Sequence, residues 1–253
     1  MIASLETQET RAQAKETKFL VSPAVASQIR EWARQNLSPD PEAVTAADDV
    51  YTVTSLYLDT PSLDIFFRNK NFGRSKYRIR RYGSSEMIFL ERKLRTNKLL
   101  AKHRSRIPLG ELALLEEGQT PGWIGDWFQR RMLAKRLWPV CKIAYERTAR
   151  VGNSLYGPIR LTLDENLRAT PVSSLGFPTT ETPWERIEAG KVVLELKYRT
   201  AISAKFKELA ARFQLAPVPF SKYRATLPRV GVVDAFCEME TKSPLEKVST
   251  YVG

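Results

Sequence analysis

Charged side chains recur at every second position in several short segments, and these positions are where the chain can do chemistry. Lys76, Arg78 and Arg80 share one side of a predicted strand, and Glu195 and Lys197 share one side of another. Side chains two apart on a strand point to the same face. A half-buried strand normally carries mixed polar residues on its wet face, whereas this face is nearly all ionic. The pattern predicts a sheet face that binds a polyanion.

The same alternation runs through most of the predicted strands. Its basic members are Lys18, Lys76, Arg78, Arg80, Lys93, Lys102, Arg104, Arg106, Arg147, Arg160 and Lys197. Its acidic members are Glu16, Glu91, Asp164 and Glu195. For any single strand, a solvated sheet face is the simpler interpretation. Repetition over many strands favours a closed barrel with helices outside and the ionic positions in its lumen.

The carboxylates on this face have two interpretations. Each can pair with a neighbouring lysine or arginine, and for Asp164 a salt bridge is at least as well supported as a metal role. Carboxylate oxygens also bind hard divalent ions such as Mn²⁺ or Mg²⁺, which phosphate oxygens would share. Metal bridging of phosphates is usual in phosphoryl transfer. For Glu195, within Leu-Glu-Leu-Lys-Tyr, we favour metal binding.

Composition excludes several other chemistries. The chain has 253 residues, 43% of them hydrophobic, and a formal net charge of +12. That length supports a buried core, and that charge indicates nucleic acid, an anionic membrane or phosphate-rich small molecules as partner. Cys141 and Cys237 lie far apart, and His103 is the only histidine, so disulfide frameworks, zinc sites and Ser-His-Asp chemistry are not expected. No apolar run is long enough to span a membrane, and we expect a cytoplasmic protein.

The expected fold is α+β, a closed eight-stranded antiparallel barrel or tunnel with helices packed outside. The predicted strands are 18–21, 51–58, 75–82, 87–94, 99–107, 141–151, 159–163 and 192–198. The predicted helices are 23–36, 60–67, 121–137 and 201–213, the first two starting after a hydroxyl residue followed by proline. We expect a mobile N-terminal arm over 1–14, one domain over 15–236 and a tail over 237–253. Trp123, Trp127, Phe128 and Trp138 fit core packing better than base stacking.

A series of short motifs carries a resemblance to a known family. They are Glu16-Thr-Lys18-Phe-Leu-Val, Ser55-Leu-Tyr-Leu-Asp59-Thr, Lys76-Tyr-Arg78-Ile-Arg80, Phe89-Leu-Glu91-Arg-Lys93, Tyr145-Glu-Arg147-Thr, Arg160-Leu-Thr-Leu-Asp164, Val193-Leu-Glu195-Leu-Lys197-Tyr and Phe220-Ser221-Lys222-Tyr223. Their order resembles the VTC domain, the polyphosphate polymerase member of the triphosphate tunnel metalloenzymes, a superfamily that includes the CYTH proteins. The resemblance covers roughly Glu16 to Leu227.

The resemblance implies an eight-stranded tunnel that holds a nucleoside triphosphate and a growing polyphosphate chain. It implies phosphate ligands at Lys18, Arg78, Arg80, Lys93, Arg147 and Arg160, a phosphate-bonding hydroxyl at Tyr145, and a closing pair at Ser221 and Lys222. We add Lys197 to this phosphate set from its place on the same strand face as Glu195. Lys102, Arg104 and Arg106 are further candidates.

The metal prediction centres on Glu195. The wider superfamily has an N-terminal Glu-x-Glu-x-Lys signature, and here Ala14 occupies the first glutamate position. This departure moves the metal role from the first strand, where Glu16 remains, towards Glu195 and Glu91. Eukaryotic relatives also carry a sensing domain and membrane spans that 253 residues do not accommodate. Any translocation of product would then need a separate membrane protein.

The charge pattern and the resemblance together leave three candidate functions. The first is metal-dependent transfer of the γ-phosphoryl of ATP to inorganic polyphosphate, with Lys222, Arg78, Arg80 and Glu195 as catalytic residues. The second is a triphosphatase or polyphosphatase that uses water as acceptor in the same tunnel. The third is a non-catalytic module that binds RNA or polyphosphate. Nucleic acid is disfavoured, because the basic residues follow strand alternation and are not mixed with aromatics on an exposed face.

Overall fold

One antiparallel sheet forms the centre of the molecule. The structure, a computed structural model, describes residues 7–11, 15–41, 49–69, 72, 74–95, 100–118, 120–177 and 183–242. Its main strands run in the order β1-β7-β6-β5-β4-β8-β9-β11-β2, with β3 beside β8 and β10 beside β9. The strands are β1 Thr7–Arg11, β2 Lys15–Val21, β3 Ser38–Pro39, β4 Val50–Asp59, β5 Arg74–Tyr82, β6 Met87–Arg95, β7 Leu100–Pro108, β8 Trp138–Ser154, β9 Gly157–Pro171, β10 Glu185–Arg186 and β11 Val192–Tyr198.

All eight predicted strands are present, and the structure adds three. The added β3 and β10 are two residues long. The third, β1, lies within the segment expected to be a mobile arm, and it pairs with β7 from Thr7 opposite Ser105 to Arg11 opposite Ala101. The rest of that segment, 1–6 and 12–14, lies outside the described residues, as does 243–253 of the predicted tail.

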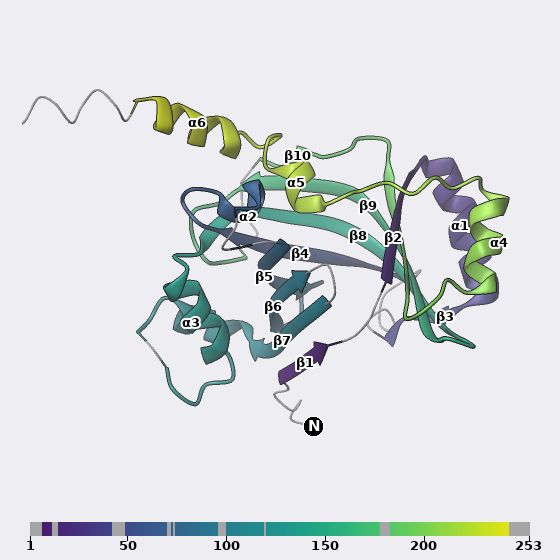
Figure 1. Ribbon diagram of the computed structural model, residues 1–253, viewed down its shortest axis with the longest axis horizontal. Helices are drawn as coiled ribbons and strands as arrows, with labels where there is room; N and C mark the ends of the chain where they lie inside the picture. Colours follow the sequence, from purple (N-terminus) through teal and green to yellow (C-terminus); the bar gives the residue numbers. More distant parts are fainter. Residues whose placement is uncertain are drawn as a thin grey trace, which may run out of the picture.

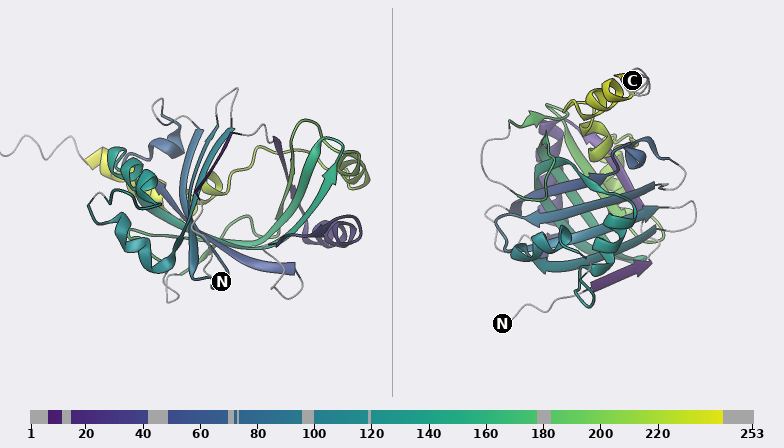
Figure 2. Two further views of the ribbon diagram at one scale, coloured as in Figure 1. Left: turned by 90° about the horizontal axis from the view of Figure 1, so that it is seen from below. Right: turned by 90° about the vertical axis from the view of Figure 1, so that its left-hand side faces the viewer.

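The sheet is not closed, so the expected barrel is wrong. The sheet curls until its two halves face each other (Figure 2), but no pairing within the described residues joins β2 to β1 or β7. Both edges have other partners. β1 occupies the edge of β7, and the Val218 backbone NH donates to the Lys18 carbonyl on β2 at 2.8 Å. Within the described residues, the sheet is therefore an open, curled surface with an inner face.

Most helices lie outside the curled sheet (Figure 1). They are α1 Pro23–Asn36, α2 Asp64–Phe67, α3 Asp126–Ala134, α4 Ala204–Arg212, α5 Lys222–Thr226 and α6 Val232–Lys242, with a 3-10 helix, η3, at Leu109–Leu115. α1 and α4 pack on β2, β9 and β11, and their caps explain where they start. The Ser22 and Ser203 hydroxyls accept from Val25 NH and Phe206 NH, each at 3.3 Å. α5 is the exception, because it reaches the inner face.

Three of the predicted helices are shorter than expected. α2 begins at Asp64, because Thr60 and Pro61 form a turn in which the Thr60 hydroxyl accepts from Asp64 NH at 3.0 Å. α3 and α4 likewise occupy only the middle of their predicted ranges. Trp127 and Phe128 are buried in the core, as expected, whereas Trp138 is 46% exposed. No helix in the described part of the chain is both long and apolar enough to cross a membrane.

Apolar residues of the strands point to the outer face, which leaves the ionic alternation on the inner face. Leu161 and Leu163 of β9 and Leu194 and Leu196 of β11 pack beneath α1 and α4. Ile79 of β5 belongs to the second core cluster, under α3. The strand period of two then directs the neighbouring charged side chains inward.

Candidate functional site

Strand register on β5, β6 and β7 surrounds Glu91 with cations. Arg78 lies opposite Glu91 on β5, and Arg104 lies opposite it on β7. Arg78 Nη2 and Nε approach Glu91 Oε2 at 2.5 and 2.6 Å, while Arg104 Nε is 3.2 Å and Lys102 Nζ 3.5 Å from Oε1. Glu91 therefore neutralises part of a basic surface.

A second carboxylate cluster lies on β2 and β11. Lys18 is directly opposite Glu195, and its Nζ is 3.0 Å from both Glu195 Oε1 and Glu16 Oε1. Lys93 Nζ, on β6, is 3.1 Å from Glu16 Oε2, so this ion pair spans the gap between the two halves of the sheet. Lys197 Nζ lies 3.4 Å from Glu195 Oε2. The two glutamates therefore converge on one ammonium, that of Lys18.

Lys222 links this cluster to Asp164. Its Nζ is 2.5 Å from Asp164 Oδ2 and 3.1 Å from Glu195 Oε1. Arg147, opposite Asp164 in the β8–β9 register, also holds this carboxylate through two hydrogen bonds of 2.6 and 2.8 Å. The Tyr145 ring lies 4.8 Å from Lys222 Nζ and 5.2 Å from the Arg147 guanidinium carbon. Asp164 is thus a salt-bridge partner, the alternative left open from sequence.

α5 delivers Lys222 to the inner face because both its cap and its second residue are anchored. Ser221 is the N-cap, and its hydroxyl accepts from Arg224 NH at 3.4 Å. The Tyr223 hydroxyl donates to buried Asp59 at 2.6 Å, and its ring stacks on Tyr57 at 5.2 Å. Lys222 stands between these anchors at the first helical position, so its ammonium projects among the carboxylates.

Arg80 and Lys76, on the inner face, form no ion pair with a carboxylate of the described residues. Arg80 is only 4% exposed, and its one hydrogen bond goes from Nε to the Ser55 hydroxyl at 3.0 Å. Lys76 donates to the Ser221 hydroxyl at 2.9 Å. A buried charge without a counter-ion is costly, so these positions favour a bound anion.

Arg160 is held at the edge of this face. Its Nε lies 2.7 Å from Asp40, and its Nη2 donates to the Tyr51 hydroxyl at 3.3 Å. Arg106 belongs to the same face by its register opposite Phe89.

The cations lower the pKa values of all four carboxyl groups. Burial raises the pKa of Glu195, but Lys222, Lys18 and Lys197 together hold it well below its ordinary value. Burial likewise raises the pKa of Glu91, which Arg78 and Lys102 bring well below the usual range. The pKa values of Glu16 and Asp164 are lowered in the same way, by lysines and by Arg147 with Lys222 respectively. All four are ionised at neutral pH.

The pKa values of three inner-face lysines, Lys76, Lys102 and Lys197, are lowered. Burial is the largest cause for Lys76, and the charges of Lys18, Lys93 and Arg78 add to it, so its pKa falls to about 7. Burial also lowers the pKa of Lys197 to about 8, although Glu195 and Glu16 act against this shift. Crowding of cations without enough counter-charge disfavours the protonated form of a lysine. A bound anion favours that form and so raises the pKa again.

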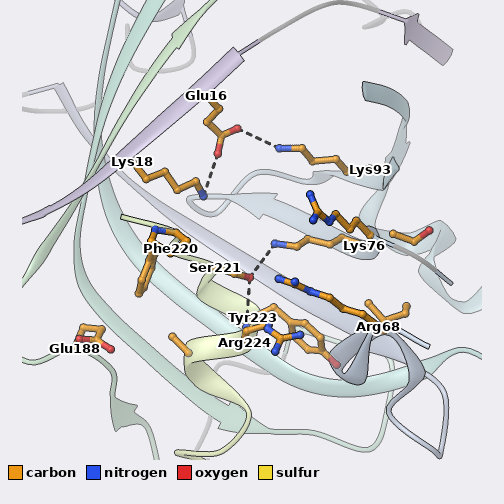
Figure 3. A pocket seen from close by; sticks show the side chains of 15 residues that line it. Glu16, Lys18, Arg68, Lys76, Lys93, Glu188, Phe220, Ser221, Tyr223 and Arg224 are labelled. Atoms are coloured by element: carbon orange, nitrogen blue, oxygen red, sulfur yellow. Dashed lines mark hydrogen bonds and ion pairs between the residues drawn. The ribbon is translucent and has the colours of Figure 1, made fainter. Parts of the chain in front are cut away.

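A cavity of about 560 Å³ opens at the α2–α5 end of this inner face (Figure 3). We call it the mouth cavity. Its polar lining consists of Glu16, Lys18, Arg68, Arg74, Ser75, Lys76, Lys93, Glu188, Ser221 and Arg224. Lys18, Lys76 and Lys93 belong both to this lining and to the inner face, so the two are continuous.

The carboxylates differ in their fit to a divalent cation. Glu16 and Glu195 reach one common cation, Lys18, which shows that both can face a single positive centre with hard oxygen ligands. The partners of Glu91 are the cations of β5 and β7, and no other carboxylate joins them. No group of three His, Cys, Asp or Glu side chains with metal-binding geometry occurs in the described residues. The donor set of Glu16 and Glu195 fits such an ion if phosphate oxygens complete it, whereas that of Glu91 does not.

The structure thus gathers the sequence-predicted residues on one surface. Lys18, Arg78, Arg80, Lys93, Tyr145, Arg147, Arg160, Lys197, Ser221, Lys222, Glu16, Glu91 and Glu195 all lie on or at the edge of the inner face. Sequence reasoning missed Ser55 as a partner of Arg80, and it missed Arg68, Arg74 and Arg224. Ser55 stood in a quoted motif and Arg74 continues the alternation of Lys76, Arg78 and Arg80 on β5, but Arg68 and Arg224 follow no strand alternation.

Comparison with solved structures shows a shared fold. A proposed adenylate cyclase from Bacillus halodurans superposes with a TM-score of 0.50 at 14% identity, covering 84% of this chain and 95% of that one. A protein from Pyrococcus horikoshii superposes with a TM-score of 0.48 at 12% identity, covering 85% of this chain and 99% of that one. A proposed adenylyl cyclase from Hippeastrum, described as having a dominant triphosphatase activity, gives 0.43 at 14% identity, with 89% and 96% covered.

Comparison with sequences identifies the family. No curated protein matches the chain. The family model of the VTC domain matches residues 13–230, which include every strand of the inner face except β1 as well as α5. This chain therefore belongs to the VTC domain family.

Proposed function

We propose that this protein transfers the γ-phosphoryl group of ATP to the end of an inorganic polyphosphate chain on the inner face of the curled sheet. The observation that carries the proposal is the excess of cations on that face, where buried Arg80 forms no ion pair with a carboxylate of the described residues. A multiply charged phosphate chain supplies the missing negative charge. Membership of the VTC family supports the same substrate class.

The arginines and lysines have different tasks in this mechanism. Arg78 and Arg80, two residues apart on β5, present planar guanidinium groups that bind phosphate oxygens bidentately. Lys222 places a compact ammonium where negative charge builds on the transferring group. The terminal oxygen of the acceptor chain attacks the γ-phosphorus, the bond to the β,γ-bridging oxygen breaks, and ADP leaves. No covalent nucleophile is needed, because positioning and charge neutralisation supply the catalysis.

Glu195, with Glu16, would hold a divalent ion, Mn²⁺ or Mg²⁺. When bound, such an ion neutralises charge on the phosphate oxygens. The carboxyl groups are prepared for this role because their lowered pKa values keep them ionised. Lys18 and Lys222 hold the two carboxylates in place on either side.

Product analysis tests the proposal directly. The purified protein is incubated with ATP and Mn²⁺, and polyphosphate growth, ADP and free phosphate are measured in the same samples. The proposal predicts polyphosphate formation in proportion to ADP. Free phosphate in proportion to ADP without chain growth would identify a hydrolase and refute the polymerase. Binding of polyphosphate or RNA without any turnover would identify a non-catalytic module.

A further inference from the structure

Three arginines at the mouth cavity were not among the predicted phosphate ligands. Arg68 is the residue after α2, Arg74 begins β5, and Arg224 is on α5. Arg224 comes from a segment far from the other two in the sequence, and all three line one opening, at which Figure 3 labels Arg68, Arg224 and Lys76. All three are exposed at the rim, so their charges are accessible to a ligand.

These arginines are gathered without matching carboxylates. Arg224 donates to the Phe66 carbonyl, and its pKa is lowered by burial and by the charge of Arg68. Arg68 has a φ of 62°, an uncommon backbone conformation for a residue other than glycine. Two acidic residues line the cavity. Glu16 is already paired with Lys18 and Lys93, and Glu188 is on the far side from Arg68 (Figure 3). Like charges held together in this way favour an anion.

The cavity continues the path of the inner face. Lys18, Lys76 and Lys93 line its inner end, and Ser221, beside Lys222, lines its floor. An anion that is long enough to contact Lys222 and also leave the inner face passes Lys76 before it meets the arginines. A longer linear phosphate chain places more phosphates along such a path than a triphosphate does.

We propose that Arg68, Arg74 and Arg224 form a subsite for the distal phosphates of a linear polyphosphate chain, which makes the protein prefer long chains over triphosphate. The subsite rests on the proposed function, since it extends the same phosphate-binding surface. It assigns the α2–α5 end of the inner face as the opening through which the chain extends.

The test measures the affinities for long-chain inorganic polyphosphate and for tripolyphosphate by calorimetry at low salt. The variant is Arg68→Gly combined with Arg74→Gln. Glycine accepts a positive φ without strain, so the fold is preserved, and thermal unfolding checks this. Arg224 is left unchanged because its hydrogen bond to Phe66 has a structural role. The long-chain affinity should fall at least about tenfold, since hydrogen bonds to charged groups are each worth roughly tenfold or more, while the tripolyphosphate affinity changes less than about twofold.

The matched control is Arg212→Gln, which removes one exposed arginine from α4 on the outer face. It should leave the ratio of the two affinities unchanged. An unaltered ratio in the double variant, or an equal loss in the control, would overturn the subsite while leaving the proposed function intact. If the wild-type protein bound neither phosphate, the proposed function would fail, and the subsite with it.

Discussion

Lys222 offers the sharpest test of the ion network, because its ammonium is the link between two buried carboxylates. We predict that Lys222→Met destabilises the protein. The ammonium lies 2.5 Å from Asp164 and 3.1 Å from Glu195, and both carboxylates are at most 5% exposed. Methionine is also unbranched and close to lysine in size, although one atom shorter, and it removes the charge together with its hydrogen-bond donors.

The magnitude follows from what remains after the substitution. Removing one partner of a buried ion pair costs about 3–5 kcal/mol, because the other charge stays buried and unpaired. Asp164 keeps Arg147, and Glu195 keeps Lys18, so neither is left alone. We therefore expect a loss near the lower limit, about 3 kcal/mol in the free energy of unfolding.

Urea denaturation at pH 7 measures this loss. The pKa of Lys222 is raised, so its stabilising contribution is complete below the unfolded value near 10.5 and is lost only at higher pH. The pKa of Glu195 is lowered, so its contribution is complete above its unfolded value and is lost as the pH falls. Neutral pH therefore measures the intact pair.

A control variant and a double variant separate the effect of the ion pair from a general loss of stability. Lys207→Met, at an exposed position of α4, should change the free energy of unfolding by less than about 0.5 kcal/mol. Adding Glu195→Gln to Lys222→Met should cost less than the sum of the two single changes, with a coupling of at least about 0.5 kcal/mol. A loss below about 1 kcal/mol for Lys222→Met, or strict additivity, would show that this link does not stabilise the fold.

Three further predictions concern binding and activity. Arg80→Lys keeps the charge but loses the planar guanidinium group that binds phosphate bidentately, so the affinity for tripolyphosphate should fall about tenfold in calorimetry. An unchanged affinity would show that Arg80 does not bind phosphate. Glu195→Gln should abolish Mn²⁺-dependent turnover, whereas Glu91→Gln should retain a Mn²⁺ optimum; the reverse outcome would assign the metal role to Glu91. Because the pKa of Lys76 is about 7 and anions favour its charged form, tripolyphosphate affinity should fall between pH 6 and 8. Lys76→Arg should flatten that dependence, and an identical profile in this variant would exclude Lys76 as the titrating group.

The amino-acid sequence alone determined the strands and the chemistry of their two faces. Alternation of period two is a local property, so Arg78, Arg80, Glu195 and Lys197 could be placed on one side of their strands without any tertiary information. The N-cap at Ser22 was equally readable, because a serine hydroxyl followed by Pro23 satisfies a local backbone requirement. The charge excess on the inner face followed from these positions.

Only the tertiary structure decided which charges meet. Alternation tells which face a side chain is on, but not how far a sheet curls or what lies along its edges, where the structure places β1 and Val218. Asp164 could be a metal ligand or a salt-bridge partner until the register placed Arg147 opposite it and α5 brought in Lys222. The mouth cavity itself could not be predicted, although alternation on the strands places Lys18, Lys76 and Lys93 of its lining on the inner face. Its arginines come from a helix end, a strand start and a short helix, whose proximity arises from long-range packing.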